Sequence, residues 1–104
     1  MDKKAIKQAI TDALALSRTA ERGKLSGCGR VYIAVSGDKA TINAVSAACK
    51  KASLMFLRKA YGTGGNVIYF GYDNADGRAS GQAELFAKTL NTSGISCYVD
   101  YVGD

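Results

Sequence analysis

The residues best suited to chemistry stand in the segment Tyr72-Asp73-Asn74-Ala75-Asp76-Gly77, which follows an apolar run. Carboxylate oxygens are ligands that Mg²⁺ prefers, so Asp73 and Asp76 are candidate ligands for this ion. The same residue types also end strands and cap helices, because Asn and Asp side chains accept hydrogen bonds from nearby backbone N–H groups. Metal binding and simple capping are therefore both open interpretations of this segment.

The rest of the composition restricts the chemistry further. The chain contains no histidine, so imidazole bases, Ser–His and Cys–His pairs and most zinc sites are excluded within it. The cysteines Cys28, Cys49 and Cys97 are far apart and match neither a disulfide framework nor a CxxC metal site. We therefore expect reduced thiols, a cytoplasmic protein and a binding function without catalysis.

Charge is distributed unevenly along the 104 residues, whose formal net charge is +5. Residues 1–65 are basic, whereas residues 66–104 are acidic. This asymmetry favours an anionic partner on one side of the molecule, or self-association into a homodimer through opposite charges. No apolar run is long enough to cross a bilayer, so we expect no membrane association.

Apolar periodicity predicts one α/β domain over residues 1–104. An N-terminal amphipathic helix is expected within residues 1–22, followed by a βαβαβ core over residues 30–104. Such alternation predicts a small, Rossmann-like parallel sheet of three strands with helices on both faces. The expected helices cover residues 2–20, 39–61 and 79–90, and the expected strands cover residues 30–36, 66–72 and 95–102.

Parallel strands would bring their carboxyl ends to one edge of the sheet, where ligands of such folds bind. Acidic and amide side chains there would orient hydroxyls or Mg²⁺, small residues and arginine would meet phosphate, and Tyr72 would stack on a base. The alternative is that Asp38 and its counterparts only cap helices. The candidate ligand-binding residues are Ser36, Gly37, Asp38, Tyr72, Asp73, Asn74, Asp76, Gly77, Arg78 and Ser80.

Six tyrosines are many for a chain of this length. Those within the expected strands should be half-buried in the core with their hydroxyl groups reaching outward. Tyr72 differs, since it stands at a strand end, and it is the best candidate for stacking on a base.

Residues 67–99, "VIYFGYDNADGRASGQAELFAKTLNTSGISCYV", resemble part of a Toprim domain, which occurs in primases and topoisomerases. The resemblance implies Mg²⁺ held by a glutamate after the first strand and an Asp-x-Asp pair after a later one, for nucleotidyl transfer or strand cleavage. Here the first strand ends in Ser36-Gly37-Asp38 without a glutamate, and Asp73 and Asp76 are one residue too far apart. The resemblance therefore implies a degraded or rebuilt active site.

Together these features predict a small non-catalytic protein that binds an anionic ligand, either a nucleotide or a nucleic acid, at the sheet edge. One alternative is a phage- or plasmid-type inhibitor that acts through protein contacts or sequesters a nucleotide signal. Another is a minimal Mg²⁺-dependent nuclease or nucleotidyl-transfer domain of the Toprim type.

Overall fold

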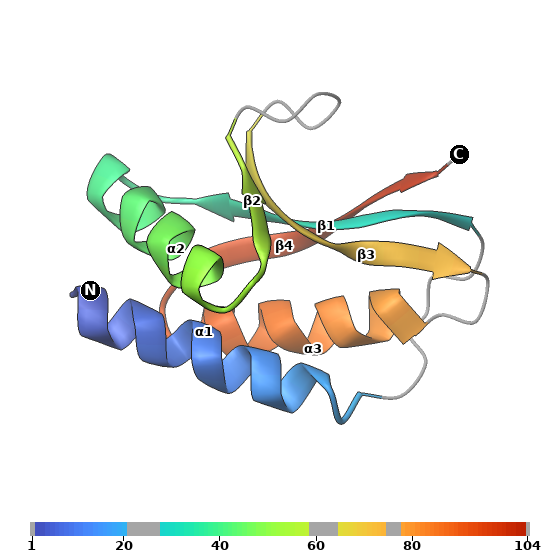
Figure 1. Cartoon of the computed structure of the whole chain (residues 1–104), viewed down its shortest axis with the longest axis horizontal. Coiled ribbons are helices and arrows are strands. Elements are labelled where there is room, and N and C mark those ends of the chain that lie inside the picture. Colours follow the sequence, from blue (N-terminus) through green and yellow to red (C-terminus); the bar gives the residue numbers. More distant parts are fainter. Residues whose placement is uncertain (1, 21–27, 59–64, 75–77, 104) are drawn as a thin grey trace.

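The computed structural model describes residues 2–20, 28–58, 65–74 and 78–103 of the chain (Figure 1). Helices and strands alternate along it, as the periodicity predicted, with one additional short strand. In chain order the elements are α1 (Lys3–Ser17), β1 (Cys28–Ser36), α2 (Lys39–Lys51), β2 (Met55–Leu57), β3 (Asn66–Asn74), α3 (Arg78–Thr92) and β4 (Ser96–Gly103).

The sheet has the strand order β2-β3-β1-β4, and every neighbouring pair is antiparallel. The predicted parallel three-stranded sheet is therefore wrong. The difference arises from β2, a strand that the prediction lacked. Because β3 runs antiparallel to β2 and pairs with it, β3 lies between β2 and β1 in the sheet. Each of α2 and α3 then connects two strands separated by a third, which is the βαββαβ, or ferredoxin-like, arrangement preceded by α1.

The strand β2 was missed because the helix before it ends earlier than predicted. The helix α2 stops at Lys51 instead of continuing over residues 39–61. Ser53 adopts a left-handed conformation with φ 61°, and the N–H of Leu54 donates to the carbonyl of Cys49 at 2.8 Å. This is the hydrogen-bond pattern of a Schellman cap, which ends a helix and releases the next residues into a strand.

The other helix ends follow from local residues as well. The Asp2 side chain caps α1 by accepting a hydrogen bond from the Ala5 N–H at 2.7 Å. Gly94, with φ 98°, stands just after α3, and the Ile95 N–H donates to the Leu90 carbonyl at 3.0 Å. The prediction that Gly94 ends this helix is confirmed, because glycine takes this conformation without steric cost.

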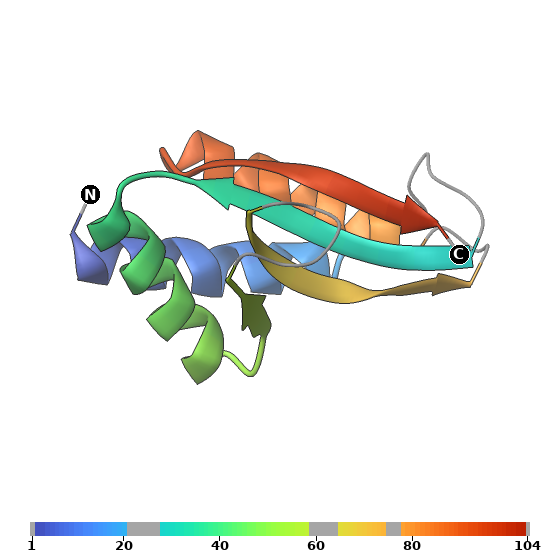
Figure 2. The same cartoon turned by 90° about the horizontal axis from the view of Figure 1, so that it is seen from above.

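The helices of the described chain all lie on one side of the sheet (Figures 1 and 2), so the prediction of helices on both faces is wrong. On β1, Val31, Ile33 and Val35 are buried against the helices. Arg30 and Tyr32 alternate with them, and they therefore stand on the opposite face of the sheet. We call the helix-covered face the inner face and the opposite one the outer face.

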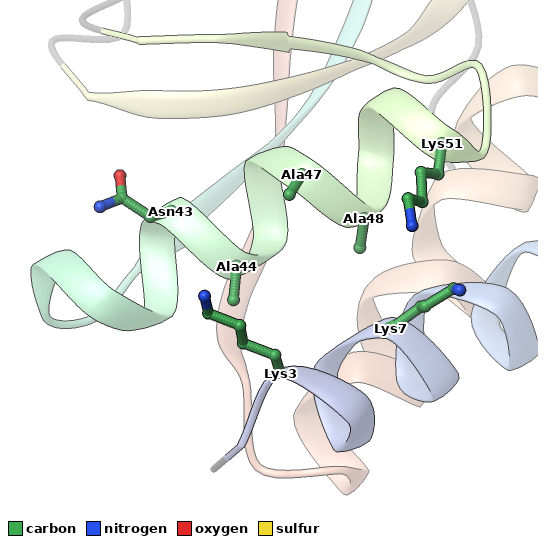
Figure 3. Close-up of a pocket in the computed structure, with 7 residues that line it drawn as sticks. All are labelled: Lys3, Lys7, Asn43, Ala44, Ala47, Ala48 and Lys51. Carbon is green, nitrogen blue, oxygen red and sulfur yellow. The ribbon is translucent and has the colours of Figure 1, made fainter.

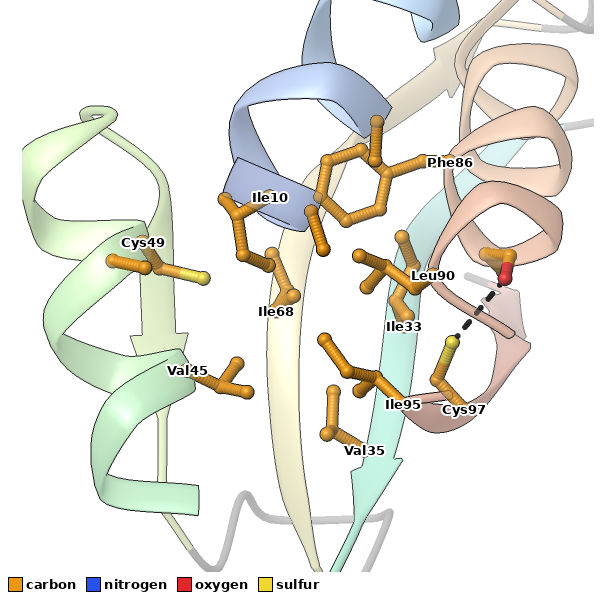
Figure 4. Close-up of a cluster of buried hydrophobic side chains, with 14 of the residues drawn as sticks. Ile10, Ile33, Val35, Val45, Cys49, Ile68, Phe86, Leu90, Ile95 and Cys97 are labelled. Atoms are coloured by element: carbon orange, nitrogen blue, oxygen red, sulfur yellow. Dashed lines mark hydrogen bonds between the residues drawn. The ribbon is translucent and has the colours of Figure 1, made fainter. Parts of the chain in front are cut away.

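The core lies between the inner face and the helices (Figure 4). Ile10 of α1 is 1% exposed and stands between Cys49 of α2 and Phe86 of α3. The ring of Phe86 meets Phe70 of β3 edge-on, with the ring centroids 5.2 Å apart. The N-terminal helix is thus an integral part of the core, because it contributes its buried stripe to the space between the other two helices.

Two cysteines are part of this core. Burial raises the pKa of the Cys49 thiol to about 12 and that of the Cys97 thiol to about 11. The Cys97 thiol also lies 3.4 Å from the carbonyl oxygen of Ala87, to which it donates a hydrogen bond. Both groups are therefore neutral thiols at physiological pH, in keeping with the free cysteines expected from their spacing.

Replacing Ser53 with glycine should stabilise the protein. The left-handed conformation costs a non-glycine residue roughly 1–2 kcal/mol, and the greater entropy of glycine in the unfolded chain offsets part of this. We expect Ser53→Gly to raise the free energy of unfolding by about 0.5–1 kcal/mol in urea titrations. A Tm below that of the wild type would contradict the assignment of this cap.

The buried thiol of Cys49 should make stability depend on alkaline pH. Its pKa rises from 9.0 when exposed to about 12 when folded, so between these values the folded state holds a proton that the unfolded state has lost. The contribution of this thiol to the free energy of unfolding is fully present below pH 9. Above pH 9 it falls by up to about 1.4 kcal/mol per pH unit. Urea titrations should show a smaller alkaline loss in Cys49→Ala than in the wild type, and equal losses would contradict this account.

Candidate functional site

The predicted edge site is divided by the antiparallel sheet. Asn74, at the end of β3, pairs with Cys28 at the start of β1, whereas Ser36 stands at the other end of β1. At about 3.3 Å per residue, these two positions are roughly 26 Å apart. Ser36 and Asn74, the last residues of β1 and β3, therefore do not meet in one cleft.

At the first of these ends, Ser36 pairs with Ser96 of β4 and Gly37 follows it. The next residue, Asp38, caps α2 by accepting a hydrogen bond from the Thr41 N–H at 2.7 Å. Hydrogen bonding to Thr41, above all by its backbone N–H, lowers the pKa of the Asp38 carboxyl group. For Asp38 the capping interpretation is therefore confirmed.

At the second end, Asp76 and Gly77 lie outside the described residues, and Asp73 and Asn74 are described only as backbone of β3. Arg78 begins α3, and Ser80 is fully buried within it. In the parts of the chain that the structure describes, no cluster of Asp, Glu or Cys side chains forms a metal site. Metal binding by Asp73 and Asp76 stays a prediction.

Tyr72 lies near this end of β3, on the outer face of the sheet. It pairs directly with Arg30 of β1, which shares the outer face with Tyr32. Tyr32 in turn pairs with Tyr69 of β3, and the centroids of their rings are 5.4 Å apart. Tyrosines on β1 and β3, the two central strands, therefore share the outer face with Arg30, the direct cross-strand neighbour of Tyr72.

A β-bulge explains how Tyr69 and Tyr72 reach the same face although they are three residues apart. The pairing of β1 with β3 shifts between Val31 and Tyr32, so that β3 carries Phe70 as an extra residue. Without the bulge, strict alternation would turn Tyr72, three residues after Tyr69, toward the helices. Gly71, the residue after Phe70, adopts a backbone φ of 150°, which residues other than glycine rarely adopt.

The edge strand β4 completes the outer face. Tyr98 pairs with Ala34, Asp100 with Tyr32, and Val102 with Arg30. Tyr98 is 62% exposed, and its small cross-strand neighbour Ala34 leaves the ring accessible from the middle of the sheet. On the opposite edge, Met55 of β2 pairs with Tyr69 and is also exposed.

The described part of the outer face is aromatic and nearly neutral. Its charged groups are Arg30, which is exposed, and Asp100, which is half-buried. Tyr72 is 41% exposed, whereas Tyr32 and Tyr69 are half-buried against each other. Large rings on a solvent-facing surface bind flat apolar groups, and a tyrosine hydroxyl adds hydrogen bonding at the rim.

Of these residues, only Tyr72 was identified as a ligand-binding candidate from the sequence. Arg30 and Tyr32 alternate with buried valine and isoleucine in "RVYIAVS", and this alternation is typical of a strand with one open face. The tyrosines were instead assigned to the core, because a parallel sheet with helices on both faces was assumed.

Comparisons with protein-family models, with curated proteins and with solved structures found no match for this chain. The Toprim resemblance of residues 67–99 therefore stays a prediction. No helix in the described residues is long and apolar enough to span a membrane.

Replacing Gly71 should damage the bulge without a steric clash. An added Cβ would lie 3.8 Å from the Ala79 Cβ, an ordinary contact, so the expected cost comes from φ alone. We expect Gly71→Ala to lower stability by on the order of 1–3 kcal/mol in urea titrations. Gly65→Ala is the matched control, since its Cβ would meet nothing within 4 Å, and an equal loss in both variants would refute the role of φ.

Proposed function

We propose that the protein binds single-stranded nucleic acid on the outer face of its sheet. The observation that carries the proposal is the placement of Tyr32, Tyr69, Tyr72 and Tyr98 on one face, which also carries Arg30. Unpaired bases stack on such rings, with about 1–3 kcal/mol per base, and every base offers a flat face for this contact. The ligand class is the one expected from the sequence, whereas its site is different.

The arrangement of the rings favours single strands over duplexes. Bases in a duplex are already stacked on one another, so their flat faces are inaccessible to tyrosine side chains. Successive outer-face residues of a strand are about 6.8 Å apart, and the neighbouring strand lies about 4.8 Å away. Tyr98 and the pair Tyr32–Tyr69 therefore offer separate platforms to bases that are spread out along an extended chain.

Arg30 is suited to contact a phosphate at the Tyr72 end of the face, next to the pair Tyr32–Tyr69 and on the side away from Tyr98. It is exposed and stands between Tyr72 on β3 and Val102 on β4. A guanidinium group binds phosphate oxygens through paired N–H donors, and it also stacks on aromatic faces. With Asp100 nearby, the described face has no excess of positive charge, so stacking must supply most of the affinity.

The same use of a sheet is known from RNA-recognition motifs. In those domains a four-stranded sheet carries aromatic side chains on which two or three bases stack. The described chain also forms a four-stranded sheet, and its open face carries tyrosines on the central strands. This is an analogy of fold and surface chemistry, which supports the proposal without identifying a family.

Substitution of Tyr98 tests the proposal directly, because this ring is the most exposed of the described tyrosines on the face. We expect Tyr98→Ala to weaken the binding of a fluorescent single-stranded oligonucleotide by about 1–3 kcal/mol, which is roughly five- to 150-fold, in anisotropy titrations. Tyr98→Phe retains the ring and should bind nearly as well as the wild type. Both DNA and RNA strands should be titrated, with the matching duplexes as weak binders.

Leu16→Ala is a suitable control, since Leu16 is a large exposed apolar residue on α1. The logarithm of affinity should fall with the logarithm of salt concentration at a slope of about −0.7, the value for one phosphate contact in a single strand. Equal affinity of Tyr98→Ala and the wild type would refute the proposal. A stable dimer in which Tyr98 is buried would refute it as well.

A further inference from the structure

A basic groove lies between α1 and α2, on the helical side of the molecule (Figure 3). Its volume is about 240 Å³. Lys3 and Lys7 rise from α1, and Lys51 comes toward them from α2. We call this surface the lysine groove, and its floor consists of Ala44, Ala47 and Ala48 of α2.

The charges of the lysine groove are not balanced within it. None of the described residues that line it is acidic. Lys3 and Lys7 are four residues apart on α1, and their side chains point in opposite directions along the groove (Figure 3). Both walls of the groove therefore carry positive charge, and an anion between the helices would balance it.

A further cation, Arg58, contacts one of the residues that line the lysine groove. The Arg58 Nη2 donates a hydrogen bond to the Asn43 Oδ1 at 2.8 Å, and Asn43 lines the groove. The Arg58 guanidinium carbon lies 6.0 Å from the centroid of the Phe56 ring, which helps to hold the group over β2. Arg58 does not itself line the groove, so the charges within it come from the lysines of α1 and α2.

We propose that the lysine groove is a second binding site, specific for the diphosphate group of a small molecule such as a nucleoside diphosphate. Lysine ammonium groups bind phosphate as point charges, and the charges of Lys3, Lys7 and Lys51 match the multiple negative charge of a diphosphate. The alanine floor gives an apolar surface for the sugar or base. The site lies on the other side of the sheet from the tyrosines, and it is independent of the nucleic-acid proposal.

The size of the groove agrees with such a ligand. Pockets that enclose an entire drug-sized molecule measure about 300–1,000 Å³, which is larger than this groove. A group the size of a diphosphate with an attached sugar would fill it, and the remainder of the ligand would extend into solvent. The helices α1 and α2 are in contact with each other. The groove between them stays open because the α2 residues that line it include three alanines, whose side chains are small.

The test is a titration followed by amide NMR shifts, with inorganic pyrophosphate and ADP as probes on the full chain. We expect saturable shifts at Ala44, Ala47 and Ala48 with both probes, and ADP should bind at least as tightly as pyrophosphate. The double variant Lys7→Gln/Lys51→Gln should lose roughly a hundredfold affinity or more, since it removes two charged hydrogen bonds and each contributes about tenfold or more.

The matched control is Lys4→Gln/Lys50→Gln, which removes the same charge from the same helices at residues outside the groove. This control should retain nearly the affinity of the wild type. Equal losses in both double variants, shifts elsewhere, or no saturable shift at millimolar concentrations would overturn the proposal. Oligonucleotide binding should be the same in both double variants, so failure at the lysine groove is distinguishable from failure at the outer face.

Discussion

The alternation of β1 between two environments is the constraint on which the rest of the structure depends. This strand pairs with β3 on one side and β4 on the other, so its side chains can only stand on the inner or the outer face. A conservative change such as Ile33→Val would keep an apolar side chain on the inner face, whereas a shift by one residue would not be tolerated. It would turn Tyr32 into the core and expose the buried positions. One register therefore specifies both the hydrophobic core and the aromatic surface.

The bulge on β3 connects folding with the candidate site in the same way. The extra residue, Phe70, joins the core through its edge-on contact with Phe86. By the same insertion, Tyr72 is returned to the outer face beside Arg30. An irregularity that disrupts the hydrogen bonds of a sheet is costly by itself, and here the added ring in the core offsets that cost. The surface arrangement of the tyrosines is thus stabilised by packing on the opposite side of the sheet.

The sequence was sufficient to predict that three helices and the three longer strands exist, because each has a clear hydrophobic period. It was not sufficient to predict the order and direction of the strands, and the location of the candidate site depends on these. The run Met55–Leu57 continues the helical spacing of α2, and only Ser53 interrupts it, where a glycine would have marked the helix end. Val67 and Ile68 are both fully buried although they stand on opposite faces, which is the pattern of a parallel strand covered on both sides. Antiparallel pairing instead separates the expected acidic edge residues and gathers the tyrosines on a face that a parallel arrangement would have covered.

The two surfaces are electrostatically separate at physiological ionic strength. The inner face and the helical layer lie between the outer face and the lysine groove, and a single packed layer already adds about 10 Å. The Debye length is about 8 Å under these conditions, so the charges of Lys3, Lys7 and Lys51 are largely screened at Tyr98. The three lysines of the groove therefore give no support to binding on the outer face. Recognition there must come from contacts within the face itself, and phosphate recognition in the groove must come from the lysines that line it.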